Sequence, residues 1–154
     1  MSETFNVINE LMVDIYNDIL KIEENAFKDS RFNDVSITEV HTIEAIGMYE
    51  PKSMGEIAKA LKITVGTLTV AINNLVKKGY VERYRSDNDR RVVKIGLTKK
   101  GRLLFRVHLS FHRAMINKCV EGLTGEQEEI LTQSLKRVSS FLKEHYHLLE
   151  LRCV

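Results

Sequence analysis

Apolar residues recur at alternating intervals of three and four near both ends of the chain, which is the spacing of one stripe along a helix. The N-terminal stripe consists of Phe5, Ile8, Met12, Ile15, Ile19 and Ile22. The C-terminal stripe consists of Leu131, Leu135, Val138, Leu142, His145 and Leu149. A third stripe, in a helix from about residue 98 to Gly122, consists of Leu104, Val107, Phe111, Met115 and Cys119. The pattern predicts three long helices, and the last begins at Thr124, whose spacing to Gln127 is that of a capping box.

Shorter helices are predicted between the long ones, over residues 37–47, 53–61 and 64–78. Ser53 is a suitable N-cap for the second of them and precedes Glu56 at capping-box spacing, while Thr64 is a suitable N-cap for the third. Gly79 is suited to end the third helix. Because only two residues separate the second helix from the third, the sequence predicts a helix-turn-helix with a supporting helix followed by a recognition helix.

After Gly79 the period of the apolar residues falls to two, which is typical of strands. Two strands are predicted, over residues 80–85 and 91–97, joined by a segment rich in turn formers at 86–90. This β-hairpin is the wing of a winged helix-turn-helix. The predicted fold class is therefore mainly α, a winged helix-turn-helix with a β-hairpin wing, flanked by long terminal helices.

The chain is predicted to form one unit, residues 1–154, in which residues 35–103 are the winged lobe. Residues 1–30 and 104–154 supply the terminal helices. Their long apolar seams have little other sequence to pack on, because the winged lobe must bury a core of its own. We therefore expect the terminal helices to form a homodimer, with a monomeric helix bundle as the alternative.

The net charge of the chain is only +2, but the charges are segregated. Residues 1–51 contain 3 Lys/Arg and 11 Asp/Glu, residues 52–106 contain 14 and 4, and residues 107–154 contain 6 and 6. The middle third, which contains the predicted helix-turn-helix and wing, thus has a net charge of +10. This distribution indicates a surface that binds a polyanion such as DNA, whereas the alternative is an ordinary solvated charged face.

Helical periodicity divides the recognition helix into two faces. The face expected to be buried consists of Val65, Leu68, Ala71, Ile72 and Leu75. The candidate DNA contacts of the helix-turn-helix are Ser53, Thr64, Gly66, Thr67, Thr69, Val70, Asn73, Asn74 and Lys77. Threonine hydroxyls can donate to phosphates, an asparagine can pair with adenine through two hydrogen bonds, and valine can contact a thymine methyl. Plain solvation is the alternative for the two asparagines.

The wing supplies further candidate DNA contacts, which are Arg83, Arg85, Asp89, Arg90 and Arg91. Asp89 and Arg91 are two residues apart on a strand and so share a side, which allows the carboxylate to orient the guanidinium for a narrow minor groove. Arg90 faces the other way and could reach a phosphate. The alternative is an exposed ion pair that contributes almost nothing.

Other classes of protein have little support. The chain lacks an apolar run long enough for a membrane span and an N-terminal signal peptide, so we expect a cytoplasmic protein without a membrane partner. Neither a phosphate-binding glycine loop nor a catalytic triad spacing is present, so no enzyme, catalytic residue or cofactor is predicted. His108 and His112 could hold a metal on one helical face, but the sequence shows no third ligand beside them, and no metal site is predicted.

The segment GTLTVAINNLVKKGYVERYRSDNDRRVVKIGLTKKGR, residues 66–102, resembles the MarR family of bacterial regulators, most specifically in KKGYVER, DNDRR and LTKKG. The order of predicted elements extends the resemblance to nearly the whole chain. It implies a homodimer with interlocked terminal helices, bound to a pseudo-palindromic site on double-stranded DNA. Recognition helices would enter successive major grooves, and Arg91, supported by Asp89, would enter the minor groove.

More narrowly, KDSRFNDVSITEVHTIEAIG and TVGTLTVAINNLVKKGYVER are similar to the fatty-acid-biosynthesis repressors of Firmicutes within that family. This resemblance implies repression of lipid-synthesis genes with a long-chain acyl-acyl carrier protein as corepressor. Candidate residues for an acyl-chain pocket are Phe27, Phe32, Ile43, Ile46, Phe105 and His108, with core packing as the alternative. Release by a phenolic ligand or by oxidation of Cys119 is the alternative regulation, although the position of Cys119 on an apolar seam predicts a buried, inert thiol.

Overall fold

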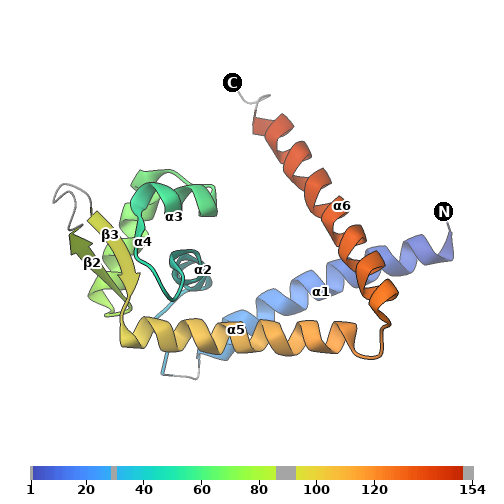
Figure 1. Cartoon of the computed structure of the whole chain (residues 1–154), viewed down its shortest axis with the longest axis horizontal. Coiled ribbons are helices and arrows are strands. Elements are labelled where there is room, and N and C mark those ends of the chain that lie inside the picture. Colours follow the sequence, from blue (N-terminus) through green and yellow to red (C-terminus); the bar gives the residue numbers. More distant parts are fainter. Residues whose placement is uncertain (1, 29–30, 86–92, 151–154) are drawn as a thin grey trace. The chain divides into compact units, whose positions relative to one another are not determined.

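The computed structural model describes residues 2–28, 31–85 and 93–150, and its contacts divide the chain into two units, 1–110 and 111–154. The described residues form six helices and three strands (Figure 1). In chain order these are α1 (Glu3–Lys28), α2 (Ile37–Ile46), β1 (Lys52–Ser53), α3 (Met54–Leu61), α4 (Val65–Lys77), β2 (Val81–Arg85), β3 (Val93–Leu97), α5 (Lys99–Val120) and α6 (Gly125–Glu150). The predicted helices and the hairpin strands are therefore confirmed, and the fold is a winged helix-turn-helix.

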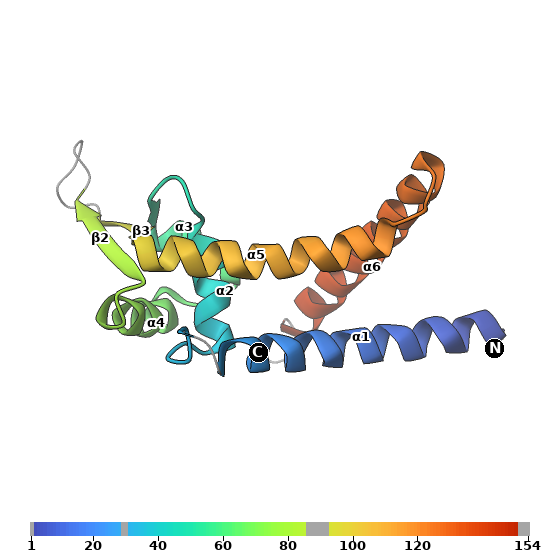
Figure 2. The same cartoon turned by 90° about the horizontal axis from the view of Figure 1, so that it is seen from below.

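The helix-turn-helix lobe, which we define as α2 to β3, gathers three short helices and the strands (Figures 1 and 2). Its residues supply most of one hydrophobic core, to which Phe32 and Leu104 are added from outside the lobe. Helices α2, α3 and α4 pack against one another and against an antiparallel sheet with the strand order β1-β3-β2. The fully buried side chains include Val40, Ile43, Ile46, Ile57, Leu68, Ile72, Leu75, Tyr80 and Ile95. Strand β1 was not predicted, because its two residues show no periodicity and form a strand only by pairing with Ile95 and Lys94 of β3.

Local capping sets the boundaries of the short helices. Ser53 accepts a hydrogen bond from the Glu56 amide and Thr64 accepts one from the Thr67 amide, as the sequence predicts. A third cap, Ser36, forms the same capping box with Glu39 at the start of α2. Between α3 and α4 the backbone turns at Lys62, whose φ of 55° is left-handed and costs energy for a residue other than glycine.

The start of α5 is locked to the start of β2 by a close backbone approach. A side-chain carbon added at Gly101 would lie 2.1 Å from the Tyr80 carbonyl oxygen, so only glycine fits there. The Thr98 hydroxyl donates to the Gly79 carbonyl at 2.7 Å, and the Thr98 amide donates to the Tyr80 carbonyl at 3.0 Å. These bonds place the LTKKG segment directly against the end of the recognition helix.

The apolar stripes of the terminal helices are exposed in the single chain. In α1 the exposed side chains include Phe5, Ile8, Met12 and Ile15, and in the second unit those of α6 include Ile130, Leu135, Phe141 and Leu142. Cys119, near the end of α5, is exposed as well, so the expectation of a buried thiol was wrong for the single chain. None of the described helices is both long and apolar enough to cross a membrane.

Candidate nucleic-acid interface

One face of α4 anchors the helix in the core of the helix-turn-helix lobe. Leu68, Ile72 and Leu75 are fully buried there, in the order that the helical period predicts. Val65 was expected on the same face but is 49% exposed. It occupies the first position of the helix, one turn before Leu68, and so lies beyond the edge of the core. The burial of the following turns fixes the rotation of α4 and therefore the set of side chains that face outward.

The opposite face of α4 is open to solvent. The exposed residues are Gly66, Thr67, Thr69, Val70, Asn73, Asn74 and Lys77, all of them candidates from the sequence. Beside this face, a shallow depression is lined by Ser36, Thr38 and Glu39 of the α2 N-terminal segment and by Thr67, Val70, Ala71, Asn74 and Lys78 of the α4 region. The structure thus brings the predicted recognition residues together with a second wall, from α2, that sequence reasoning did not include.

Several hydroxyl groups of the candidate contacts already have partners within the lobe. The Thr69 hydroxyl donates to the Val65 carbonyl at 2.7 Å, and the Ser53 hydroxyl donates to the Glu56 carboxylate at 2.8 Å. The hydroxyls of Thr64 and Thr67 lie 2.9 Å apart. To donate to a phosphate, the hydroxyl of Thr69 or Ser53 would have to give up its present hydrogen bond. Both residues therefore have a structural role in the free chain.

The two adjacent asparagines of α4 differ in their surroundings. The Asn73 carbonyl oxygen accepts a hydrogen bond from the guanidinium of Arg83 on β2. Within the described residues the side chain of Asn74 has no hydrogen-bond partner, and it lines the depression. Because pairing with adenine uses both the carbonyl and the amino group, Asn74 is the asparagine that is ready for such a contact. Asn73 instead connects the recognition helix to the wing.

Basic side chains continue from α4 onto the wing strands. Arg83 and Arg85 of β2 are exposed, and Lys94 of β3 is exposed where it pairs with Tyr84. The remaining candidates of the wing, Asp89, Arg90 and Arg91, lie outside the described residues. The described part of the interface is therefore an exposed recognition helix flanked by arginines of one strand.

A buried ion pair joins the two walls of the depression. The Glu39 carboxylate, which is almost fully buried, accepts hydrogen bonds from the Lys78 ammonium at 2.7 and 2.8 Å. The same carboxylate accepts a 2.8 Å hydrogen bond from the Ser36 amide at the start of α2. Because one side chain caps α2 and binds Lys78, the C-cap residue of α4, the spacing of these helices is fixed by a charge that is costly to leave unpaired.

A second polar cluster, at Asp34, supports the same region. The hydroxyl of fully buried Tyr80 donates to Asp34 at 2.5 Å, and the Lys100 ammonium lies 3.2 Å from the other carboxylate oxygen. Burial alone would raise the pKa of Asp34, but the hydrogen bonds from Tyr80 and Lys100 outweigh it and lower that pKa below its ordinary value. Burial, and then the hydrogen bond to Asp34, raise the pKa of Tyr80. Lys100 also lies 4.0 Å above the Tyr80 ring.

The candidate acyl-pocket residues occupy different places in the structure. Phe32, Ile43 and Ile46 are buried in the core of the helix-turn-helix lobe, and Phe105 packs against that core. His108 is buried and lies 2.9 Å from the Glu23 carboxylate. The side chain of Phe27, the sixth candidate, lies outside the described residues.

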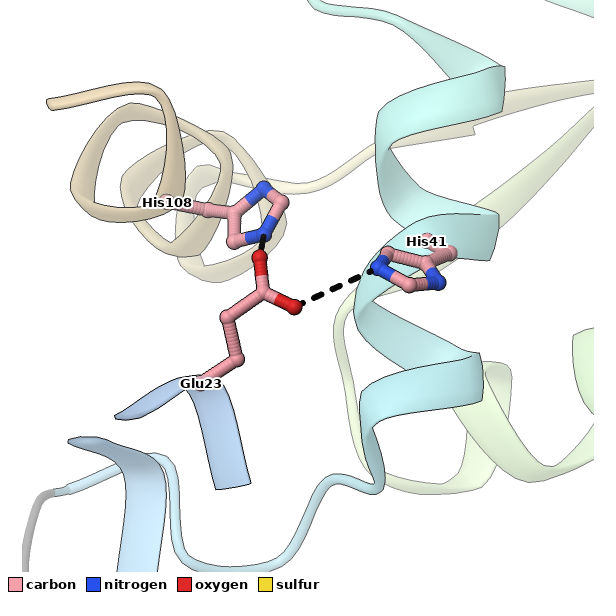
Figure 3. A group of neighbouring side chains, drawn as sticks. All are labelled: Glu23, His41 and His108. Atoms are coloured by element: carbon pink, nitrogen blue, oxygen red, sulfur yellow. Dashed lines mark hydrogen bonds and ion pairs between the residues drawn. The ribbon is translucent and has the colours of Figure 1, made fainter. Parts of the chain in front are cut away.

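Sequence reasoning missed the surroundings of His108. The Nε2 atom of His41, on α2, lies 3.7 Å from the second Glu23 oxygen, so the carboxylate from α1 stands between two imidazoles (Figure 3). Along the chain the intervals between the three residues are 18 and 67 positions, and the residues lie on three helices, so no spacing in the sequence could have grouped them. His108 therefore has two potential co-ligands on other helices, where the sequence had offered only His112 on the same helix.

Comparisons with known proteins agree with this geometry. A family model described as the MarR family matches residues 35–93. The crystal structure of Streptococcus pneumoniae FabT in complex with DNA is 44% identical to the chain, with a TM-score of 0.80, and the match covers 91% of this chain and 98% of that one. The S. aureus MepR–DNA complex is 25% identical, with a TM-score of 0.67, covering 86% and 94%. The HTH-type transcriptional regulator PchR of Bacillus subtilis (strain 168) is 23% identical over 154 residues, covering 90% and 91%.

Proposed function

Since this chain belongs to the MarR family of DNA-binding transcriptional regulators, we propose that it is a homodimeric repressor of fatty-acid-synthesis genes. Its corepressor would be a long-chain acyl-acyl carrier protein. The observation that carries the proposal is the 44% identity, over 91% of the chain, to FabT in complex with DNA. The resemblance of two segments to fatty-acid-biosynthesis repressors adds the class of regulated genes.

The geometry of α4 supports a specific mode of DNA binding. The exposed face lies within a segment of net charge +10, and its polar side chains can reach the base edges of a major groove. In this mode Asn74 reads a base, Val70 contacts a thymine methyl, and Lys77 and Arg85 neutralise phosphates. Arg91, oriented by Asp89, enters the adjacent minor groove. Two copies bind the two halves of a pseudo-palindromic operator.

The exposed apolar stripe of α1 supports the homodimer. A row of large apolar side chains along a helix is stable in water only when it is covered, and a second copy of the chain supplies a matching stripe. A sedimentation experiment at micromolar concentration measures this directly. A single species of twice the chain mass is expected, and a monomer that persists at this concentration would contradict the homodimer.

The DNA-binding mode is tested by charge removal with a matched control. Lys77→Ala is expected to weaken binding to all sequences and to reduce the slope of log affinity against log salt by about one unit, because one phosphate contact is lost. Arg91→Ala is expected to weaken binding and to relax the preference for A·T-rich flanks. Lys136→Ala, which removes the same charge from an exposed position of α6, should leave both quantities unchanged. Unchanged binding by Arg91→Ala would exclude the wing contact.

The corepressor is tested by operator affinity with three additions: none, acyl carrier protein without an acyl chain, and the same protein carrying a long acyl chain. Only the last is expected to tighten binding. A result in which the acylated and unacylated proteins act alike would refute the lipid effector while leaving DNA binding intact.

Regulation by oxidation is the second candidate, and the exposure of Cys119 in the single chain favours it. An accessible thiol can be oxidised, whereas a buried one is inert. Peroxide would then lower operator affinity in the natural chain and leave Cys119→Ser unaffected. If the variant lost affinity to the same extent, this route would be excluded.

A further inference from the structure

Glu23, His41 and His108 form a compact group of metal-ligating side chains within the first unit of the chain (Figure 3). One potential ligand atom from each residue lies within 4.8 Å of the others. The carboxylate comes from α1, and the imidazoles come from α2 and α5. Three rigid helices thus present two nitrogens and one oxygen to a common point.

The spacing of these atoms fits a small transition-metal ion. Bonds of about 2.0–2.1 Å to a tetrahedral Zn²⁺ place its ligand atoms roughly 3.4 Å apart. The Glu23 oxygens lie 2.9 Å from Nε2 of His108 and 3.7 Å from Nε2 of His41, so the observed distances fall on both sides of that value. All three ligand atoms lie within 4.8 Å of one another, so binding one ion would require the side chains to draw together around it.

A second carboxylate, that of Glu44, lies near the other ring nitrogen of His108. The Glu44 oxygen lies 3.9 Å from Nδ1 of His108, on the opposite side of the ring from Glu23. Histidines that bind a metal through one nitrogen usually donate the other N–H to a carboxylate or carbonyl, which fixes the ring and its tautomer. Glu23 belongs to α1, whereas Glu44 belongs to α2, the helix that also carries His41.

The burial of Glu23 and His108 distinguishes this group from a cluster of surface side chains. The side chains of Glu23 and His108 are only 3% and 4% exposed, while His41 is 45% exposed and open to solvent. A carboxylate with so little access to water is compensated by neighbouring polar groups, such as His108 at 2.9 Å, and more fully by a positive partner. A divalent cation between the carboxylate and two neutral imidazoles provides this compensation, and the exposed edge at His41 provides a route of entry.

We propose that Glu23, His41 and His108 bind one divalent transition-metal ion of the Zn²⁺ class. Imidazole nitrogens select such ions over Mg²⁺ and Ca²⁺, which prefer all-oxygen sites. A water or a further side chain would complete the coordination. The ion would join α1, α2 and α5, and the proposal is independent of the lipid effector.

The test uses Co²⁺ as a coloured substitute for Zn²⁺ on the full chain, without an affinity tag. Addition of Co²⁺ is expected to produce the visible absorption of a four-coordinate ion, to saturate at one ion per chain, and to be reversed by Zn²⁺ but not by excess Mg²⁺. Absence of the absorption band would overturn the site. Saturation at a number of Co²⁺ ions per chain other than one would also overturn it.

His41→Ala is the decisive variant, because His41 is exposed and its loss leaves the core intact. We expect its affinity for Co²⁺ to fall at least tenfold. His145→Ala, which removes an exposed histidine from α6, should bind Co²⁺ like the natural chain. Zn²⁺ should also raise the melting temperature of the natural chain and of His145→Ala, and raise that of His41→Ala much less. Equal Co²⁺ affinity in the natural chain and His41→Ala would refute the proposal.

Discussion

Replacing Tyr80 by phenylalanine removes a single hydroxyl from the support of the recognition helix. The ring remains, fully buried against Phe32 and beneath the Lys100 ammonium. What is lost is the 2.5 Å hydrogen bond to Asp34. The substitution therefore isolates one polar interaction while the packing around it is retained.

The size of the effect follows from the partners that remain. A hydrogen bond to a charged group contributes about 1.5–3 kcal/mol to stability. The Asp34 side chain is 39% exposed and retains Lys100, so water can replace much of the lost bond. We therefore expect a cost near the lower limit, about 1–1.5 kcal/mol, or roughly 2–6 °C in melting temperature for a chain of this size.

The pH dependence of this cost has a definite sign. Asp34 has a lowered pKa in the folded chain, so its contribution is present above the unfolded value of about 4 and is lost as the pH falls through the folded pKa. Tyr80 has a raised pKa, so its contribution is present below about pH 10 and is lost at higher pH. The difference between the natural chain and Tyr80→Phe should therefore be greatest near neutral pH and should shrink at both extremes.

Urea unfolding at equal chain concentration measures the effect, and Tyr84→Phe is the matched control. Tyr84 also donates its hydroxyl to a carboxylate, that of Glu82, but this bond is exposed. Its loss should cost less than about 0.5 kcal/mol. Equal destabilisation by the two substitutions, or a Tyr80→Phe cost that does not change below pH 4, would refute the role assigned to Asp34.

Two further substitutions test the contacts that position α4. Gly101→Ala should destabilise the chain by about 1–3 kcal/mol, because the new side-chain carbon meets the Tyr80 carbonyl, whereas Gly125→Ala in open space should be neutral or slightly stabilising in thermal melts. Glu39→Gln should cost about 1–3 kcal/mol in urea unfolding, because it leaves the Lys78 ammonium without its anion; a change below about 0.5 kcal/mol would show that the pair acts like a surface ion pair.

The local features of the fold could be predicted because their causes are local. Ser53 and Thr64 cap helices within three residues of themselves, and helical periodicity placed Leu68 and Ile72 in the core. The same periodicity was wrong for Val65, because a helical wheel does not show where along the helix the core begins. Prediction was therefore good to within about a turn of helix.

The features that could not be predicted depend on distant parts of the chain. The link between Asn73 and Arg83 requires the strand to return beside the helix, and neither residue type demands it. The assembly of Glu23, His41 and His108 requires three helices to pack at one point. The number of residues between such positions does not indicate that they come together. Glu23 and His41 could therefore be grouped with His108 only from the structure.

Helix α2 connects the two surfaces described above. Its N-terminal segment, with Ser36, Thr38 and Glu39, forms one wall of the depression beside the recognition helix, and His41 lies on the same ten-residue helix. An ion that binds His41 together with Glu23 would fix α2 relative to α1. By thermodynamic linkage, any change that this ion makes in operator affinity must be matched by an equal change that the operator makes in affinity for the ion. Such coupling requires α2 to have two arrangements that differ in affinity for DNA, and the ion would act by favouring one of them.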